Sequence, residues 1–289
     1  MNAISTDLTP AEAIERVAAQ GRRVETPCGD GALVWRLWGS GPPLVLLHGN
    51  FGSWLHWIRN ILPLAERFTV IANDAPGFGE SAMPPLPCPP RDHGEILLQG
   101  LAEIVAEPTR WHLAGFSYGG RLAGEVAALA PERTASLIVL APGGLGVGDA
   151  PWPELKRMSS DMDQRERLAA HRYNVQALMI HDPAKVDDLA VHIQDWNTRH
   201  SRFKMRSWSD EERFASLARV LPTVTVPIRG IFAAKDVMAA HNMQARVDML
   251  KSIQPDADVH ILDGVGHWMP YEAPERINAL LLEMLGGDL

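Results

Sequence analysis

The chain has 289 residues, of which 46% are hydrophobic and 21% charged, which suits one large domain or a domain with an insertion. Its net charge of −8 argues against a nucleic-acid partner, which would need a basic face. Because the sequence has no apolar run of membrane-spanning length, no export signal and only two cysteines, we expect a cytoplasmic protein without a membrane partner.

The chain begins with a predicted helical extension, residues 1–21, and continues into a predicted hairpin. Thr9 and Glu12 are placed as in a capping box, and Gly21 ends the helix. Two strand-like segments, residues 23–26 and 32–38, then flank a turn rich in glycine and proline.

Short apolar runs then alternate with helical patterns. Strands are predicted at residues 44–47, 68–72, 110–114, 136–140, 226–233 and 259–262, and helices at residues 95–107, 121–129 and 274–285. Strands this apolar are typical of parallel sheets that are covered by helices on both faces. The sequence therefore predicts an α/β protein with a doubly wound, mostly parallel sheet.

One stretch breaks this alternation. Residues 147–221 contain no strand-like run and carry helical periodicity with many Arg, Asp, His and Trp residues. We interpret them as an inserted helical cap on a core made of residues 1–146 and 222–289. A second, independent domain explains the pattern less well, because the sheet pattern continues on both sides of the insertion.

The most informative motif is Gly-Phe-Ser-Tyr-Gly at residues 115–119, centred on Ser117. A predicted strand precedes it and a predicted helix follows it, which is the context of a nucleophile elbow. Glycines beside the serine leave room where strand and helix nearly touch. A glycine-rich turn without function could share the pentapeptide, and the strand and helix around it favour the elbow.

Two further residues complete a predicted catalytic triad. Asp236 follows the strand at residues 226–233, and His267 follows the last strand, so both lie with Ser117 at the carboxyl ends of strands, where ligands bind in such sheets. The order serine, acid, histidine is that of triads on this kind of sheet. Asp149 is the main rival for the acid, whereas Asp263 lies too near His267 in the sequence.

Acyl transfer also needs backbone N–H groups that face the developing oxyanion. One is expected from Tyr118, directly after the serine. The other is expected from Asn50 or Phe51, after the strand at residues 44–47, and the sequence leaves these two open. His48 is interpreted as a residue that holds this loop.

Four separated motifs, at residues 48–49, 74–81, 115–119 and 266–267, together resemble the α/β-hydrolase superfamily over residues 23–286. Within it, residues 141–146 and Trp268 look most like the meta-cleavage-product hydrolases, a resemblance that implies hydrolytic cleavage of C–C bonds in ring-fission dienoates. The chain differs from that family in its oxyanion loop, residues 50–54, and in Phe116, where the family often has asparagine. The cap arginine of the family has His192 as its nearest counterpart, with Arg199 and Arg202 as candidates.

We therefore predict a serine hydrolase of a small carbonyl compound, an ester or a C–C-cleavable ketone, that uses no cofactor. The sequence has 11 histidines but no metal-binding spacing, so no metal is expected. The cap is expected to set substrate choice, and the predicted substrate contacts are Phe116, Trp268, Trp152, His192, Trp196 and Arg199. A ligand-binding protein that retains the triad and a perhydrolase-type enzyme remain alternatives, and a homo-oligomer stays open.

Overall fold

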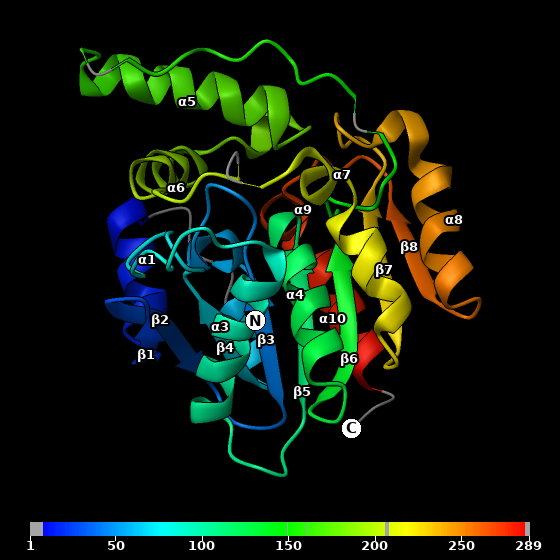
Figure 1. The fold of residues 1–289 in the computed structure, drawn as a ribbon. Helices are drawn as coiled ribbons and strands as arrows, with labels where there is room; N and C mark the ends of the chain where they lie inside the picture. The colour runs from blue at the N-terminus through cyan, green and yellow to red at the C-terminus, as the bar shows by residue number, and fades with distance from the viewer. Residues whose placement is uncertain (1–7, 149, 160, 206–207, 287–289) are drawn as a thin grey trace.

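The computed structural model, which describes residues 8–148, 150–159, 161–205 and 208–286, contains one eight-stranded sheet in the order β1-β2-β4-β3-β5-β6-β7-β8 (Figure 1). The strands are β1 (Arg22–Cys28), β2 (Gly31–Trp38), β3 (Pro43–Leu47), β4 (Thr69–Asn73), β5 (Trp111–Phe116), β6 (Thr134–Leu140), β7 (Ile228–Ala233) and β8 (Asp258–Leu262). β2 pairs antiparallel with β1 and β4, and the other pairs are parallel. The predicted hairpin and the mostly parallel sheet are thus confirmed.

The apolar runs form strands because both faces of the sheet are covered. Every residue of β3 and of β5 is buried. Proline sets one boundary that the hydrophobic pattern misses: β7 begins at Ile228 and not at Val226, because Pro227 has no N–H for the sheet ladder.

Two apolar clusters lie on opposite faces of the sheet. One joins it to α1 (Pro10–Ala18), α2 (Ile61–Ala65), α9 (Met269–Glu272) and α10 (Pro274–Gly286). The other joins it to α3 (Pro90–Ile104), α4 (Tyr118–Leu129), α7 (Asp210–Val220) and α8 (Met243–Ile253). This is the doubly wound arrangement, although the hydrophobic pattern did not single out α2, α8 or α9.

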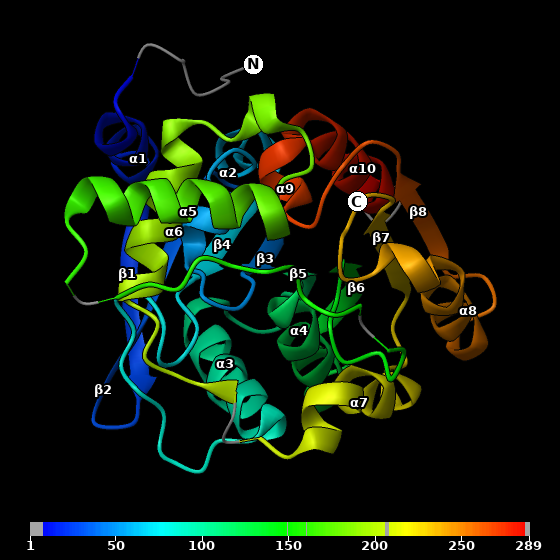
Figure 2. The same cartoon turned by 90° about the horizontal axis from the view of Figure 1, so that it is seen from above.

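The segment between β6 and β7 contains helices and, among its described residues, no strand. Helices α5 (Gln164–Leu178) and α6 (Asp188–Arg199) lie together across the end of the sheet to which the parallel strands point, and residues 150–159 run over it without helix or strand (Figures 1 and 2). Helix α7 instead packs on α4, where a Cβ at Gly124 would come within 2.6 Å of Leu217. Gly124 therefore lets α7 approach α4 closely.

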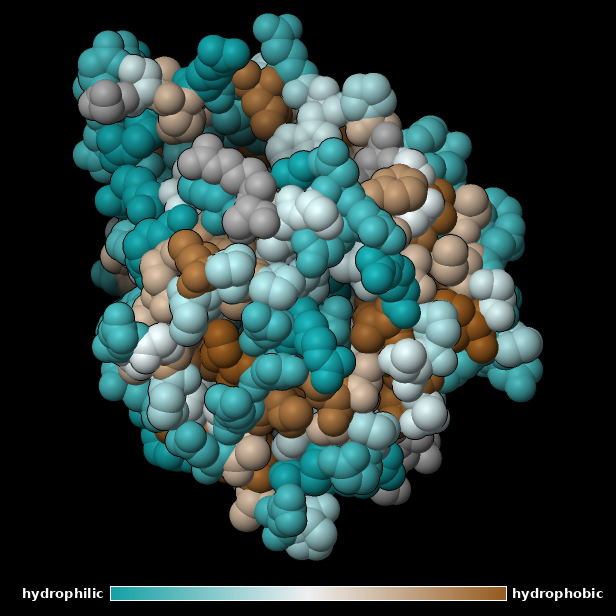
Figure 3. Space-filling model, viewed as in Figure 1, coloured by the Kyte–Doolittle hydropathy of each residue, from teal (hydrophilic) through white to brown (hydrophobic). Residues whose placement is uncertain are grey.

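The surface has no dominant apolar area on the face seen in Figure 3, where hydrophobic residues are scattered among hydrophilic ones. Within the part of the chain that the structure describes, no helix has the length and apolar character needed to cross a membrane.

Candidate active site

Ser117 occupies the sharp turn between β5 and α4. Its φ of 54° and ψ of −113° lie outside the regions that a non-glycine residue normally adopts. The Ser117 N–H donates to Leu140 O at 2.8 Å. A Cβ at Gly115 would lie 2.3 Å from Gly119 O, and a Cβ at Gly119 would lie 2.2 Å from Leu47 O, so both positions require glycine. The turn holds the serine hydroxyl out of the sheet.

Three side chains that are far apart in the sequence meet at this turn. His267 Nε2 lies 3.0 Å from Ser117 Oγ, and His267 Nδ1 lies 2.7 Å from Asp236 Oδ2. Asp236 is 2% exposed and His267 5% exposed. The Met238 N–H also donates to Asp236 Oδ1 at 3.0 Å. The result is one hydrogen-bonded chain from carboxylate through imidazole to hydroxyl.

Electrostatics keep the carboxylate of this chain ionised. Burial by itself raises the pKa of Asp236, but the charge and hydrogen bond of His267, with the Met238 N–H and Arg246, outweigh burial and bring this pKa below its usual value. The rival acid Asp149 lies outside the described residues. Asp263 is exposed.

The three candidates for the two expected oxyanion donors line one cavity. Tyr118 is the first residue of α4, so its N–H has no carbonyl partner one turn earlier in the helix. Asn50 and Phe51 line the same cavity as Tyr118. The Phe51 N–H donates to the Asn50 side-chain oxygen at 3.0 Å and is therefore already paired.

A cavity of about 360 Å³ opens onto Ser117 and reaches the segment between β6 and β7. Its walls are mainly apolar. Those supplied by the segment between β6 and β7 include Trp152, Leu155, Met158, Val175, Leu178 and Met179. Phe116 and Trp152, two of the predicted substrate contacts, are in this lining.

Trp268, another predicted contact, lies outside the lining. It is completely buried, donates from Nε1 to His56 O at 3.0 Å and packs on Tyr271 with ring centroids 4.3 Å apart. Its place beside His267 in the sequence suggested contact with substrate, but consecutive residues of this turn face different ways.

The remaining predicted cap contacts also lie outside the lining. Trp196 stacks on His200 with centroids 4.1 Å apart, and Arg199 forms an ion pair with Asp195 at 3.0 Å. His192 is half-buried on the same helix. Arg202, also considered for the carboxylate, donates to the backbone oxygens of Gly79 and Ser81.

The segment between β6 and β7 presents a different histidine to the cavity, one that sequence reasoning missed. His171 on α5 lines the cavity and is 2% exposed, with Nε2 3.5 Å from Asp195 Oδ1. Arg167 and Arg199 bind the same carboxylate, and burial lowers the pKa of His171. The sequence offered no signal for it, because periodicity does not tell which face of a cap helix meets the cavity.

Other polar residues of the lining were missed for the same reason. Gln194 and Thr198 come from α6, while Arg121 of α4 and Arg246 of α8 come from the core. Over the described ranges, no group of three or more His, Cys, Asp or Glu side chains lies where it could hold a metal ion.

Comparisons with known proteins place the chain in a family. Residues 44–280 match the model of the alpha/beta hydrolase family. A hydrolase of Comamonas testosteroni named for 2-hydroxy-6-oxononadienedioate and 2-hydroxy-6-oxononatrienedioate is 26% identical, covering 86% of this chain and 88% of that protein. The dihydrolipoyllysine-residue acetyltransferase component of the acetoin cleaving system of Pseudomonas putida is 29% identical over 85% of this chain, which spans only 64% of that relative's length.

Among solved structures, the carboxylesterase CesB of Bacillus subtilis superposes with a TM-score of 0.73 at 20% identity, covering 96% of this chain and 97% of that chain. At this identity the likeness supports the fold alone. The sequence-based resemblance to this superfamily and to hydrolases of 2-hydroxy-6-oxo-dienoates is thus confirmed, and relatives that are hydrolases support hydrolase activity. The chain belongs to the alpha/beta hydrolase family.

Proposed function

We propose that the chain is a serine hydrolase in which Ser117 is the nucleophile, His267 the general base and Asp236 the residue that orients His267. The observation that carries this proposal is the hydrogen-bonded chain of these three residues at the floor of the cavity. With the proton of Nδ1 donated to Asp236, Nε2 of His267 is left to accept the serine proton.

The reaction then follows from this geometry. Ser117 Oγ attacks the substrate carbonyl carbon while its proton passes to His267 Nε2. The N–H groups of Tyr118 and Asn50 donate to the tetrahedral oxyanion. His267 protonates the leaving group, and water then releases the acyl group from Ser117 by the same steps in reverse.

The cavity favours a small, largely apolar substrate, because about 360 Å³ is near the lower end of volumes that hold small ligands. An ester with an apolar acyl or aryl group fits it best. The cap segment, residues 147–221, supplies much of the wall remote from Ser117, and we assign substrate choice to it. A dienoate is the second candidate, favoured by the relative named above and by Arg121 and Arg246 in the lining.

Turnover of aryl esters and ring-fission dienoates, combined with labelling by a fluorophosphonate probe, tests the proposal. Ser117→Ala should abolish labelling and lower kcat by about three orders of magnitude or more, because triad members act as a unit. The matched control is Ser252→Ala, which changes a serine whose hydroxyl bonds to Met249 O on the exposed side of α8. It should retain labelling and activity.

Two results would contradict the assignment. Labelling of the Ser117→Ala variant would place the nucleophile elsewhere. Labelling of the wild type without turnover of any substrate would favour a ligand-binding protein on the same fold.

A further inference from the structure

Two buried histidines outside the proposed triad hold the backbone of Gly49 from both sides. The Gly49 N–H donates to His56 Nδ1 at 3.2 Å, and the Gly49 carbonyl oxygen lies 2.7 Å from His48 Nδ1. His48 and His56 are each 1% exposed. Gly49 directly precedes Asn50, so this clamp lies next to the proposed oxyanion donor.

The hydrogen bonds fix the tautomer of each ring. His48 Nε2 accepts the Ala75 N–H at 2.8 Å, so the proton of His48 is on Nδ1, which donates to Gly49 O. His56 Nδ1 accepts from Gly49, so a neutral His56 carries its proton on Nε2. Burial lowers the pKa of His48 to about 4, and burial with the nearby His48 and His267 brings the pKa of His56 well below its usual value. Both rings are therefore neutral near pH 7.

The clamp determines the direction of the Asn50 N–H. The Gly49 carbonyl and the Asn50 N–H belong to one peptide plane, and in a trans peptide they point in opposite directions. Because His48 binds that carbonyl on one side, the Asn50 N–H is directed to the other side. Gly49 and Asn50 both line the cavity that Ser117 lines.

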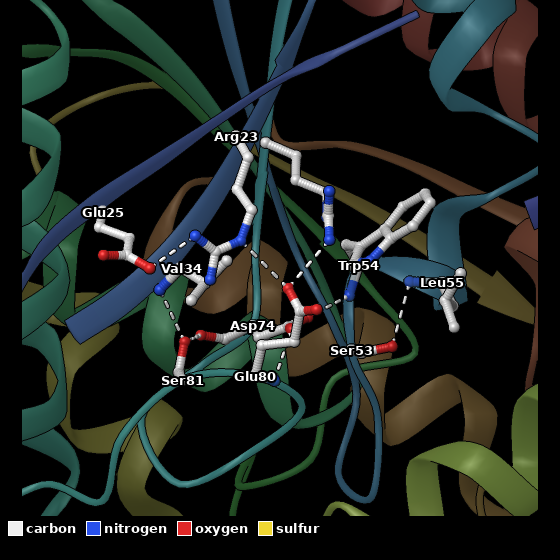
Figure 4. A network of polar contacts seen from close by, with 10 residues as sticks. Arg23, Glu25, Val34, Ser53, Trp54, Leu55, Asp74, Glu80 and Ser81 are labelled. Atoms are coloured by element: carbon white, nitrogen blue, oxygen red, sulfur yellow. Dashed lines mark hydrogen bonds and ion pairs between the residues drawn. The ribbon is translucent and has the colours of Figure 1, made fainter. Parts of the chain in front are cut away.

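His56 reaches Gly49 because the loop folds back on itself. Ser53 begins the short 3₁₀ helix η1 (Trp54–Trp57) by accepting the Leu55 N–H, which brings His56 under the loop. A Cβ at Gly52 would lie 2.4 Å from the His56 ring, so glycine is needed there. Asp74 anchors the start of η1 by accepting the Trp54 N–H at 3.0 Å (Figure 4).

Aromatic rings fix His56 in place. Its ring centroid lies 5.0 Å from that of Trp268 and 5.7 Å from that of Phe116. This contact gives Trp268 a role although it does not line the cavity: it supports His56 from the turn that carries His267. The His56 imidazole thus contacts the loop at Gly49, the end of β5 at Phe116 and the turn that carries His267 at Trp268.

We propose that His56 is a positioning residue for the reaction, which acts through the Gly49 N–H, together with His48, to direct the Asn50 N–H at the substrate oxyanion. The inference rests on the proposed serine hydrolase mechanism. It assigns a function to a histidine that neither the sequence motifs nor the proposed triad uses. Since His56 does not touch the substrate, its loss should weaken binding of the transition state and leave binding of the ground state nearly unchanged.

Replacement of His56 by leucine, asparagine and glutamine tests this role. Leucine removes the acceptor, asparagine offers an amide oxygen at the δ position where Nδ1 lies, and glutamine carries its amide one atom too far. The control is His112→Leu, which replaces another buried histidine, one that bonds to Ser136 Oγ within the sheet. The measurements are kcat and KM for an aryl ester, and the Ki of an arylboronic acid that forms a tetrahedral adduct with Ser117.

Removal of a whole oxyanion donor costs about 10²–10³ in kcat, so a misdirected donor should cost somewhat less. We expect His56→Leu to lower kcat about ten- to a hundredfold, to raise the boronate Ki by a similar factor and to change KM less than about threefold. His56→Asn should recover most of the activity and His56→Gln little of it. His112→Leu, if folded, should keep the kcat and Ki of the wild type.

The inference fails if His56→Leu keeps kcat within twofold of the wild type, or if kcat falls while the boronate Ki does not change. If His56→Leu does not fold, equal activity of the asparagine and glutamine variants would overturn it. Failure of the proposed function looks different, because the wild type would then neither bind the boronate nor label at Ser117.

Discussion

Replacing Asp236 with asparagine exchanges one oxygen for an NH₂ group, and a backbone hydrogen bond decides how the new carboxamide lies. The Met238 N–H donates to Asp236 Oδ1, so the asparagine oxygen will occupy that position. The NH₂ group is then left facing His267 Nδ1, at the 2.7 Å contact that the carboxylate makes now. An NH₂ group is a donor, so it requires Nδ1 to accept and moves the imidazole proton to Nε2.

A histidine protonated on Nε2 cannot take the proton of Ser117 and must first adopt an unfavourable tautomer. We expect kcat to fall by about three to four orders of magnitude, which corresponds to about 4–5.5 kcal/mol of lost transition-state stabilisation. KM should change little, because Asp236 lies behind His267. The assay is steady-state hydrolysis of an aryl ester, with thermal unfolding to verify the fold.

Asp263→Asn is the matched control, since Asp263 is an exposed carboxylate near His267 in the sequence, and it should keep activity within twofold. Asp149→Asn tests the rival acid directly. The reasoning is refuted if Asp236→Asn keeps more than a tenth of the wild-type kcat, and the acid is misassigned if Asp149→Asn is the damaging change.

Two further predictions concern other buried groups. Burial, opposed by Arg91 and reinforced by Glu95, raises the pKa of Glu125 to about 7. Between about pH 4.5 and 7 the folded protein therefore keeps a proton on Glu125 that the unfolded chain releases. The free energy of unfolding falls as pH rises through this window. Glu125→Gln should therefore raise the free energy of unfolding at pH 8 by up to about 3 kcal/mol and far less at pH 4.5, and equal gains in urea titrations at both pH values would contradict this. His171→Leu should raise KM about two- to tenfold for esters whose acyl end carries a hydroxyl or amide and not for plain alkyl esters, and equal kinetic effects on both would show that His171 makes no substrate contact.

The sequence alone predicted the parts of this protein that depend on local order. Apolar runs identified the buried strands, because a parallel strand that is covered on both faces is apolar along its length. The alternation of these strands with helical patterns identified the doubly wound sheet. Ser117, Asp236 and His267 each follow one of those strands, so the sequence predicted that the three lie together at the carboxyl ends of the strands. Strand boundaries shifted by a residue or two, as at Pro227, where a missing N–H outweighs hydrophobicity. Helix boundaries shifted further, since the helix predicted at residues 95–107 is α3, Pro90–Ile104.

Which residues face the cavity was decided by the tertiary structure. His171 lines it whereas Trp196 and Arg199 do not, because the packing of α5 and α6 on the core sets which helix faces are turned inward. Trp268 follows His267 directly but packs beneath the site against His56. A sequence pattern gives the period of an element, but not its rotation about its own axis.

The choice between the two loop amides shows the same limit at the scale of one hydrogen bond. The sequence by itself gives no reason to prefer the N–H of Asn50 or that of Phe51 as the second oxyanion donor. They differ only because the Asn50 side chain pairs with the Phe51 N–H and because two histidines, His48 beside the loop and His56 in the following turn, hold Gly49. The direction of a peptide N–H depends on what binds the carbonyl of its own plane. That partner is brought there by the fold, so Asn50 could be proposed as the donor only after the chain had been placed in three dimensions.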